Sequence, residues 1–396
     1  MNPIDPTESP SSAARRRGVF AIVVVMCAVG AAAYAWHAIQ RSRAAEVAQG
    51  PIRSAQIGEL PGAAPSAPEH SASMPSATPS MGTTPSPEMG AGPATLTAGS
   101  AATKPRPFLL FRSTALGDSY GRVSLAYLDA LGGERLVSPL QCERVHYAAG
   151  TGLCLEAQRG ALTTYQAHLF DRNFRITRSF PLAGPPSRAR VSPDGKYAAM
   201  TVFVTGHSYG GTSFTTRTSI IDVAGGRMLA EDLEAFEVAR AGEIIKAADF
   251  NFWGVTFARD GKRFYATLGT AGKTLLVEGD LAARRMQVLR DDVECPSLSP
   301  DNQRIAFKRR HAGSAAAPVT WGVVVLDLAS GRETALLAET RNVDDQVEWL
   351  DNGTLLYGMP KEASASTDIW AAAADGGSKP RLYLPLAYSP AIVTRP

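Results

Sequence analysis

One short motif in this chain has the pattern of a catalytic serine. Gly206 to Gly211 read GHSYGG and fit G-x-S-x-G, with Ser208 at the centre. In enzymes this pattern marks a nucleophile elbow, a strained strand-to-helix turn that presents the serine beside an oxyanion hole. The chemistry would be acyl transfer, with a histidine as general base. The preceding residues, TVFV at 201–204, supply the strand that such an elbow needs.

The residues after the motif favour a structural role for Ser208. They read TSFTTRTSIID, a β-branched run that predicts a second strand rather than a helix. A triad in the order Ser, Asp, His needs a histidine beyond Ser208, and only His311, in the basic stretch KRRHAGSAAA, follows it. We therefore interpret 206–211 as a glycine-rich loop between two strands and predict no catalytic residue.

Metal and cofactor chemistry find no support in the sequence. His146 and His168 each stand alone in strand-like segments, where a histidine is more often packed or exposed than bound to a metal. No cluster of histidine, cysteine and carboxylate residues has the spacing of a metal site. We expect neither a metal ion nor a cofactor.

The cysteines leave one pairing open. Cys142, Cys154 and Cys295 follow the N-terminal third of the chain, and the first two are close together in the sequence. If this region is exported, that spacing invites a disulfide. A tight turn at 149–151, however, would place Cys142 opposite a residue near Gln158, which is a poor cross-strand geometry for the bond.

The elements that must position any site are revealed by a repeat. Six times an apolar strand runs into an aspartate at a turn, often with glycine close behind. The spacing of successive aspartates is roughly 40–60 residues, and such a period in an all-strand sequence is typical of a β-propeller with one four-stranded blade per repeat. The six aspartates are Asp129, Asp171, Asp222, Asp280, Asp327 and Asp375.

A second repeat marks the inner half of each blade. Segments such as RARVSPDGKYAAM, GVTFARDGKRFYA, PSLSPDNQRIAF and VEWLDNGTLLY place a tight turn between two apolar runs, and a degenerate copy lies near Gly150. These are five inner hairpins against six outer turns. Leu386–Val393 reads as one more inner strand, whereas Phe108–Arg112 lacks an inner neighbour. We predict that the C-terminal strand completes the first blade and closes the ring.

These hairpins resemble the repeats of TolB-like six-bladed propellers over about residues 108–396. The resemblance implies an all-β, six-bladed propeller and leaves the function open. The additional N-terminal α/β domain of TolB itself is not found here, so a role in outer-membrane integrity is not carried over.

A binding site is expected at the channel mouth where the inner strands begin, because ligands of propellers usually bind at a mouth. A charged and aromatic rim there would suit a protein, peptide or glycan, although the same residues could simply be solvated. The insertion 231–249 predicts a short helix or arm over this rim. The candidate binding residues are Arg144, Arg188, Phe252, Trp253, Glu294 and Asp345.

The N-terminal region predicts a membrane anchor and a spacer. Residues 18–39 contain no acid and no base other than His37, and about 20 such residues cross a bilayer. Arg15 to Arg17 place residues 1–17 in the cytoplasm and the propeller, 107–396, outside it. A cleaved signal peptide is the alternative. Residues 40–106, rich in Ala, Pro and Ser, predict a disordered linker.

Two functions remain compatible with the sequence. The first is a membrane-tethered, extracytoplasmic propeller that acts as a binding or scaffold module without chemistry of its own. The second is a hydrolase or lyase that uses residues of the channel mouth, such as Glu294 with Asp345. The net charge of +3 and the scattered basic residues argue against a nucleic-acid partner.

Overall fold

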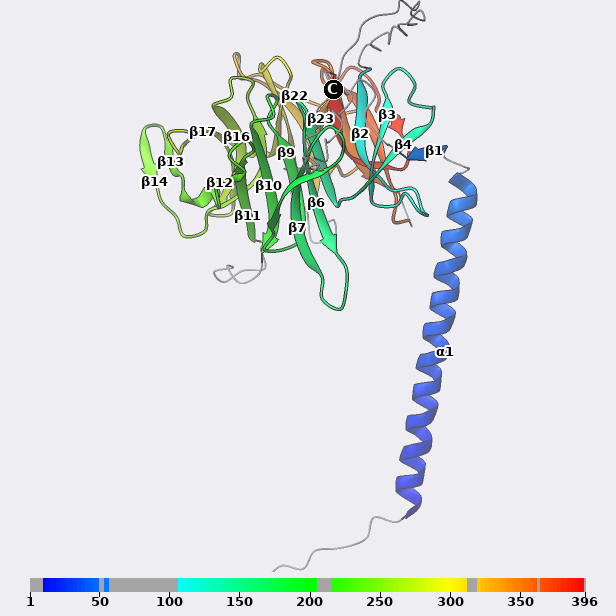
Figure 1. The fold of residues 1–396 in the computed structure, drawn as a ribbon. Coiled ribbons are helices and arrows are strands. Elements are labelled where there is room, and N and C mark those ends of the chain that lie inside the picture. The colour runs from blue at the N-terminus through cyan, green and yellow to red at the C-terminus, as the bar shows by residue number, and fades with distance from the viewer. Residues whose placement is uncertain are drawn as a thin grey trace, which may run out of the picture.

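The structure is a computed structural model in which one N-terminal helix precedes a ring of six β-sheets (Figure 1). It describes residues 10–49, 53–56, 106–204, 215–311, 319–361 and 364–394. Each sheet is one blade, and four antiparallel strands form its body. The expected all-β, six-bladed propeller is confirmed.

The strands succeed one another from the ring centre outward. The innermost strands of blades 1 to 6 are β27 (Ala387–Val393), β5 (Arg144–Ala148), β9 (Pro186–Val191), β15 (Asn251–Phe257), β19 (Glu294–Leu298) and β23 (Glu348–Trp349). The second strands are β2 (Phe108–Ser113), β6 (Thr151–Gln158), β10 (Tyr197–Val204), β16 (Arg263–Thr270), β20 (Arg304–His311) and β24 (Thr354–Pro360).

The third and fourth strands complete the blades. The third strands are β3 (Arg122–Tyr127), β7 (Thr164–Phe170), β11 (Thr215–Asp222), β17 (Lys273–Asp280), β21 (Thr320–Asp327) and β25 (Thr367–Ala373). The outer strands are β4 (Arg135–Gln141), β8 (Ile176–Pro181), β12 (Arg227–Ala230), β18 (Arg285–Asp291), β22 (Glu333–Ala335) and β26 (Arg381–Leu384). Outside this pattern lie α1 (Pro10–Gln49), β1 (Ser54–Gln56), the 3₁₀ helix η1 (Leu233–Ala235), β13 (Glu237–Arg240) and β14 (Glu243–Ile245).

The six inner strands surround a central channel in a closed order. Contacts join β27 to β5, β5 to β9, β9 to β15, β15 to β19, β19 to β23, and β23 back to β27. Residues from the strand starts line one pocket and residues from the strand ends line another, so the strands run in one direction along the channel. We call the end at which they begin the upstream mouth and the other end the downstream mouth.

The ring is closed by the C-terminal strand. β27 pairs antiparallel with β2, with Phe108 opposite Val393 and Leu110 opposite Ala391. Blade 1 is therefore built from both ends of the propeller sequence, as predicted from the missing sixth hairpin. The pairing covers the inner edge of β2, which would otherwise be free.

Both faces of each blade are buried against its neighbours. Six clusters of buried apolar side chains occupy the six junctions between blades, one cluster at each. In β2, Phe108 and Leu110 pack toward blade 2, whereas Leu109 and Phe111 pack toward blade 6. Because side chains alternate along a strand, burial on both faces requires the continuous apolar run FLLF.

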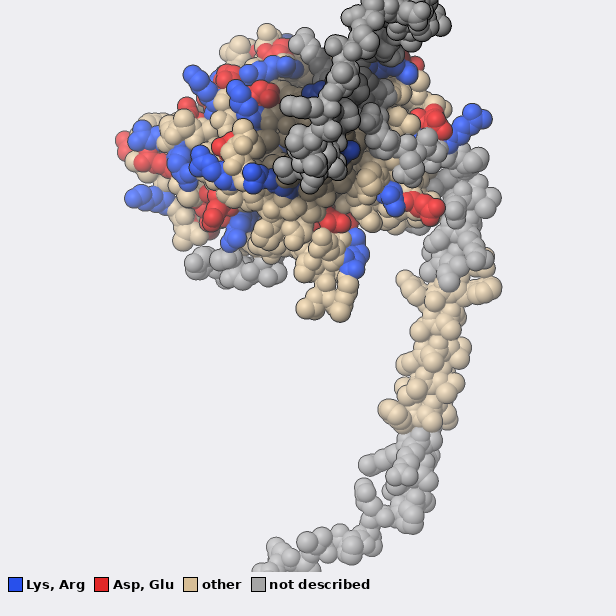
Figure 2. All heavy atoms as spheres, viewed as in Figure 1, with Lys and Arg blue, Asp and Glu red and all other residues tan. Residues whose placement is uncertain are grey.

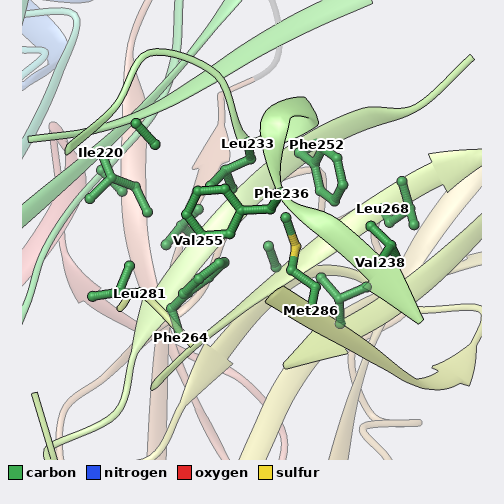
Figure 3. Packing of buried hydrophobic residues seen from close by; sticks show 14 of the residues in the cluster. Ile220, Leu233, Phe236, Val238, Phe252, Val255, Phe264, Leu268, Leu281 and Met286 are labelled. Atoms are coloured by element: carbon green, nitrogen blue, oxygen red, sulfur yellow. The ribbon is translucent and has the colours of Figure 1, made fainter. Parts of the chain in front are cut away.

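The insertion at 231–249 extends blade 4 outward instead of covering the rim. β13 pairs in parallel with the outer strand β18, and β14 pairs with β13. Leu233, Phe236 and Val238 of this insertion are buried in the junction of blades 3 and 4 together with Phe264 (Figure 3). The apolar residues that suggested a helix by their spacing thus anchor a strand at the sheet edge.

The six repeated aspartates lie at the turns between the third and outer strands, as predicted. In five blades the carboxylate accepts a hydrogen bond from a backbone N–H two or three residues further on, which closes the turn. Asp129 in blade 1 instead binds the Arg106 guanidinium. The five N–H donors, at 2.8–3.0 Å, are those of Asn173, Gly225, Ala283, Ser330 and Gly377.

Parts of the expected anchor and linker are described. Within α1, Val19–His37 is long and apolar enough to cross a membrane, with a mean hydropathy of 2.3. The helix continues to Gln49, beyond the expected end at residue 39. β1 then pairs in parallel with β4, with Ser54 opposite Arg135. The rest of the expected linker, 50–52 and 57–105, lies outside the described residues.

The packing of blade 2 can be tested by substituting a glycine that lies beneath an aromatic ring. Gly152 lies opposite Phe170 on the neighbouring strand, and a Cβ at this position would be 2.0 Å from the ring. Phe170 is buried at the junction of blades 1 and 2 and has little room to move. We predict that Gly152→Ala lowers the free energy of unfolding by about 1–3 kcal/mol.

Urea-induced unfolding of the full chain in detergent measures this change, with Gly132→Ala as the control. Nothing lies within 4 Å of a Cβ placed at Gly132, so its substitution should change stability by no more than about 0.5 kcal/mol. Equal stabilities of the two variants would contradict the packing described for Phe170.

Candidate functional site: the downstream-mouth cavity

A cavity of about 700 Å³ opens at the downstream mouth. The last residues of the inner strands and the tight turns that follow them line it. All six blades contribute, so the cavity is the end of the channel and not a cleft between two blades. The strand-end residues, in the order of blades 1 to 6, are Val393, Ala148, Val191, Phe257, Leu298 and Trp349.

Five blades place an equivalent residue in this cavity. Each residue lies one or two positions before the last residue of its inner strand. The five residues are His146, Arg190, Thr256, Ser297 and Glu348. The binding residues predicted from the sequence stand about four positions before the turn, which is one step further upstream. The sequence signal that could have revealed the cavity residues is the alternation of polar and apolar residues in RVH, RAR and VEW.

Three of these side chains form what we call the charged floor: His146, Arg190 and Glu348, from blades 2, 3 and 6. Arg190 Nη1 donates a short hydrogen bond to Glu348 Oε2, and Nη2 donates to the Val347 carbonyl at 3.2 Å. His146 Nε2 lies 3.6 Å from Glu348 Oε2. The backbone N–H of Val191 donates to His146 Nδ1 at 3.1 Å.

These contacts determine the protonation of the floor. Nδ1 of His146 accepts the Val191 N–H, and Nε2 lies 3.0 Å from Arg190 Nη1 and 3.6 Å from Glu348 Oε2, so the ring contacts both members of the ion pair. Burial and the neighbouring Arg190 lower the pKa of His146, and Glu348 only partly offsets them. Burial would raise the pKa of Glu348, but the charge of Arg190 and the hydrogen bond from His146 lower it to about 2. The floor is an ion pair beside a neutral imidazole.

The rim of the cavity consists of hairpin turns that bind one another. The N–H of Arg259 donates to Asn302 Oδ1 at 3.3 Å, and the N–H of Asp301 donates to Asn352 Oδ1 at 3.1 Å. The Arg304 side chain also donates to the Asn352 carbonyl. Turns from blades 4, 5 and 6 are thereby held at fixed positions. Between rim and floor the cavity is bordered mainly by apolar residues, among them Phe257, Leu298, Leu350, Ile392 and Val393.

Several of the predicted binding residues lie at the opposite, upstream mouth. Arg144 Nη1 binds Asp345 Oδ1 at 3.0 Å, and its guanidinium stacks over the Tyr388 ring at 4.4 Å. Arg188 lies 4.0 Å from Asp344. The pocket at this mouth measures only about 20 Å³. The structure therefore brings these residues together in contacts with one another.

The other predicted binding residues are engaged within the blades. Phe252 is 1% exposed in the cluster between blades 3 and 4, and Trp253 is also buried, with its ring close over Gly269. Glu294 accepts a hydrogen bond from Trp321 Nε1 at 3.1 Å. Asp345 binds Arg144, so the two carboxylates considered as a pair have different partners.

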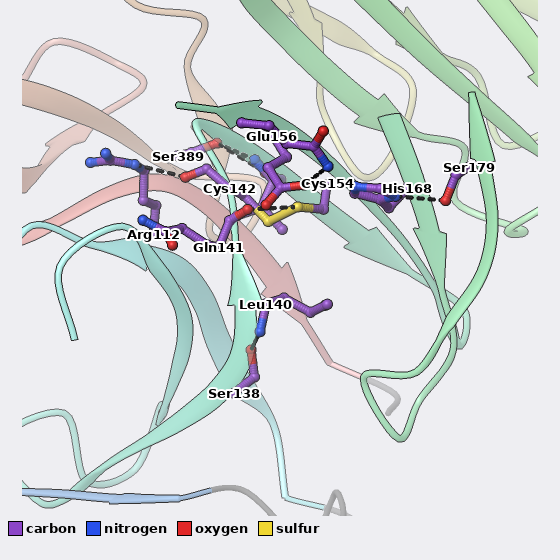
Figure 4. Close-up of a disulfide and its surroundings, with 12 residues drawn as sticks. Arg112, Ser138, Leu140, Gln141, Cys142, Cys154, Glu156, His168, Ser179 and Ser389 are labelled. Atoms are coloured by element: carbon purple, nitrogen blue, oxygen red, sulfur yellow. Dashed lines mark hydrogen bonds and ion pairs between the residues drawn. A yellow bond between two sulfur atoms is a disulfide. The ribbon is translucent and has the colours of Figure 1, made fainter. Parts of the chain in front are cut away.

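Cys142 and Cys154 are joined by a disulfide, with their Cα atoms 5.4 Å apart (Figure 4). Cys154 lies in β6, opposite Val145. Cys142, however, follows the end of β4 on the connection from blade 1 into blade 2. The register counted from the turn near Gly150 therefore does not describe its position. The bond joins two neighbouring blades.

The remaining candidates for chemistry have structural surroundings. His168 lies between Ser179 Oγ (2.8 Å) and Glu156 Oε2 (3.0 Å), as Figure 4 shows. Among the described residues, no group of three or more histidine, cysteine or carboxylate side chains could hold a metal ion. The Ser208 motif lies outside those residues, but β11 begins at Thr215, in agreement with the strand predicted there. His311 ends β20 and is exposed.

The fold is that of a six-bladed β-propeller, and it is similar to the fold of TolB. TolB from Acinetobacter baumannii superposes with a TM-score of 0.51 at 17% sequence identity, over 72% of this chain and 66% of that chain. The chain thus covers just under two thirds of that TolB. At this identity the likeness shows the fold alone.

Two further solved propellers match with lower TM-scores. A putative TolB from Agrobacterium tumefaciens has a TM-score of 0.41 and 11% identity, over 70% of this chain and 88% of that one. A chain of a nidogen–laminin complex has a TM-score of 0.45 and 11% identity, over 72% and 98%. No protein-family model matches the sequence, and no curated protein matches it.

The charged floor predicts that acid weakens the fold. The folded state lowers the pKa of His146, so the unfolded chain binds a proton that the folded chain does not. Stability should therefore fall as the pH drops below 6.5, by up to about 2 kcal/mol at pH 5. Glu348, whose folded pKa is also lowered, adds a further loss between its unfolded pKa and about 2.

Urea-induced unfolding between pH 7 and 5 measures the His146 contribution. His146→Asn keeps an acceptor for the Val191 N–H, because the amide oxygen takes the place of Nδ1, but cannot be protonated, and we expect it to reduce the loss of stability over this range. An unchanged slope in this variant would assign the effect to another group.

Proposed function

We propose that this protein is a membrane-tethered, extracytoplasmic binding module that takes up a segment of a protein partner in the downstream-mouth cavity and performs no reaction on it. The geometry of the cavity carries the proposal. Its volume of about 700 Å³ falls in the range of ligand sites. Its apolar border and rigid rim of turns suit an extended peptide, with the polar groups of the floor at its end.

The chemistry of the floor favours an uncharged polar group as the part of the partner that reaches it. Arg190 and Glu348 neutralise each other, and His146 is neutral beside them. A ligand with a free charge would gain little there and would lose its hydration. An amide can both donate and accept, and Arg190 Nε is a buried donor that finds no hydrogen-bond partner among the described residues. A peptide bond or an Asn or Gln side chain therefore matches the floor.

The same contacts support a role without catalysis. The ionised groups of the floor are engaged with one another, whereas a nucleophile needs an adjacent base that is free to accept its proton. The residues lining the cavity include Ser297 and Ser299, but the Ser299 hydroxyl binds Asp301 within its own turn. A rigid surface whose charges are already paired suits recognition.

Three observations support the tether and the location outside the cytoplasm. Val19–His37 is exposed along its length in the structure and can cross a bilayer by its length and composition. Arg15, Arg16 and Arg17 precede it, which orients the following chain away from the cytoplasm. A disulfide between Cys142 and Cys154 is also consistent with an oxidising compartment.

Changes at the rim should weaken partner binding, and circular dichroism of each variant checks that the fold is kept, because Arg259 Nε donates to the Pro300 carbonyl. Arg259 and Thr394 are exposed and line the cavity. We predict that Arg259→Glu, which reverses a rim charge, and Thr394→Trp, which fills the opening, each lower recovery of the partner about tenfold. The measurement is quantitative affinity capture from solubilised membranes with the full chain as bait.

Lys379→Glu is the matched control for this capture. Lys379 is exposed in the turn between β25 and β26, at the same end of the propeller but outside the cavity. Its charge reversal should leave recovery unchanged. A partner recovered equally with all three variants would place its site elsewhere, and turnover in a hydrolase panel that is lost in Glu348→Gln would replace the proposal with an enzymatic function.

A further inference from the structure

A short strand holds the propeller close to its membrane anchor. β1 pairs with the outer strand of blade 1, and the Arg135 N–H donates to the Arg53 carbonyl at 2.9 Å. Beyond the apolar segment, which ends at His37, the helix continues over 38–49, and only 50–53 separate it from β1. The helical part rises roughly 18 Å, and the connection spans at most roughly 14 Å. Blade 1 is therefore within about 30 Å of the bilayer.

The direction of the helix selects the face of the propeller that is nearer to the bilayer. β6 starts from the downstream-mouth hairpin, so the β6–β7 turn lies at the upstream end of blade 2. In Figure 1, α1 runs from blade 1 toward the side on which this turn projects. Figure 2 shows the tip of the projection near the level of the propeller-side end of the tan stretch of the helix. The upstream face is thus the face on the anchor side.

The tip of the β6–β7 turn has the chemistry of a membrane interface. Leu162 is 83% exposed, with Gly160 and Ala161 before it and Thr163 after it. Arg159 beside them is also exposed and forms an ion pair with Glu143 at 2.8 Å. Residues 157–165 contain no acidic side chain. An exposed leucine beside an arginine lies favourably at the boundary between headgroups and acyl chains.

We infer that the upstream mouth faces the membrane, that the β6–β7 turn touches the lipid headgroup region, and that the downstream-mouth cavity opens away from the bilayer. This inference rests on the membrane tether of the proposed function and adds an orientation to it. In this orientation the bilayer covers the mouth that is closed by Arg144 and Asp345. The open mouth faces partners in the aqueous compartment.

Lipid crosslinking tests the orientation in the full chain reconstituted into vesicles of phosphatidylethanolamine and phosphatidylglycerol. A photoreactive amino acid replaces Leu162 in one variant and Ile176 in another. Ile176 is the matched control because it is 49% exposed on the same blade but lies just after the downstream β7–β8 turn. We expect at least tenfold more lipid adduct from position 162. Equal or greater adduct from position 176 would overturn the orientation.

Disulfide trapping tests the docking of β1 independently. Ala55 and Leu136 are paired in register, so the double variant A55C/L136C should form a crosslink that holds the chain together after cleavage at a protease site inserted within 57–105. Single-cysteine variants should release two fragments. Release from the double variant under oxidising conditions would overturn the docking.

Failure of the inference can be told apart from failure of the proposed function. Extraction of vesicles with alkaline carbonate shows whether the chain is anchored at all, and release of the whole chain would refute the tether. An anchored chain that crosslinks lipid from position 176 would refute the orientation alone. The capture experiment with the rim variants does not depend on either result.

Discussion

Burial of each blade between two neighbours is the constraint on which the structure depends. A single four-stranded sheet with two apolar faces cannot cover itself, and here every junction between blades holds its own apolar cluster. In β2, for example, Phe108 packs into the junction with blade 2 and Leu109 packs into the junction with blade 6, so one strand contributes to both junctions. Removing any blade would expose two clusters, so the ring is stable only when closed. The channel and its two mouths follow from that closure.

The charged floor is a consequence of the same geometry. His146, Arg190 and Glu348 come from three blades that are far apart in the sequence, and ring closure brings blades 6 and 2 to either side of blade 1. Their mutual contacts satisfy charges that would be costly to bury separately. The floor therefore joins blades 2, 3 and 6 across the channel, and a partner bound there would contact a surface that exists only in the assembled ring. Binding and folding are linked through these residues.

Local patterns allowed most of the fold to be predicted. The aspartate turns and the Pro-Asp-Gly hairpins depend on side chains and backbone angles of near neighbours, so the sequence carries them directly. The site was harder to predict because it depends on long-range positions. The sequence indicated that Arg144 and Asp345 lie in the channel. It did not indicate that they bind each other and narrow the upstream mouth. The position of Cys142 could not be predicted from the strand register because this residue lies on a connection between blades. β1 was not predicted because it is too short to carry a recognisable pattern.

The pairing of β27 with β2 determines when during synthesis the ring can close. Synthesis proceeds from the N-terminus, and β2 is the first propeller strand to be made, whereas its partner is the last. Until Val393 has been produced, the apolar faces of β2 at the junctions with blades 2 and 6 lack the side chains contributed by β27. The inner edge of β2 therefore stays uncovered until almost the whole propeller has been synthesised. Because the two strands are far apart in the sequence, closure of the ring is slow and late. A chain that stops short of its C-terminus would hold several blades in sequence but no ring.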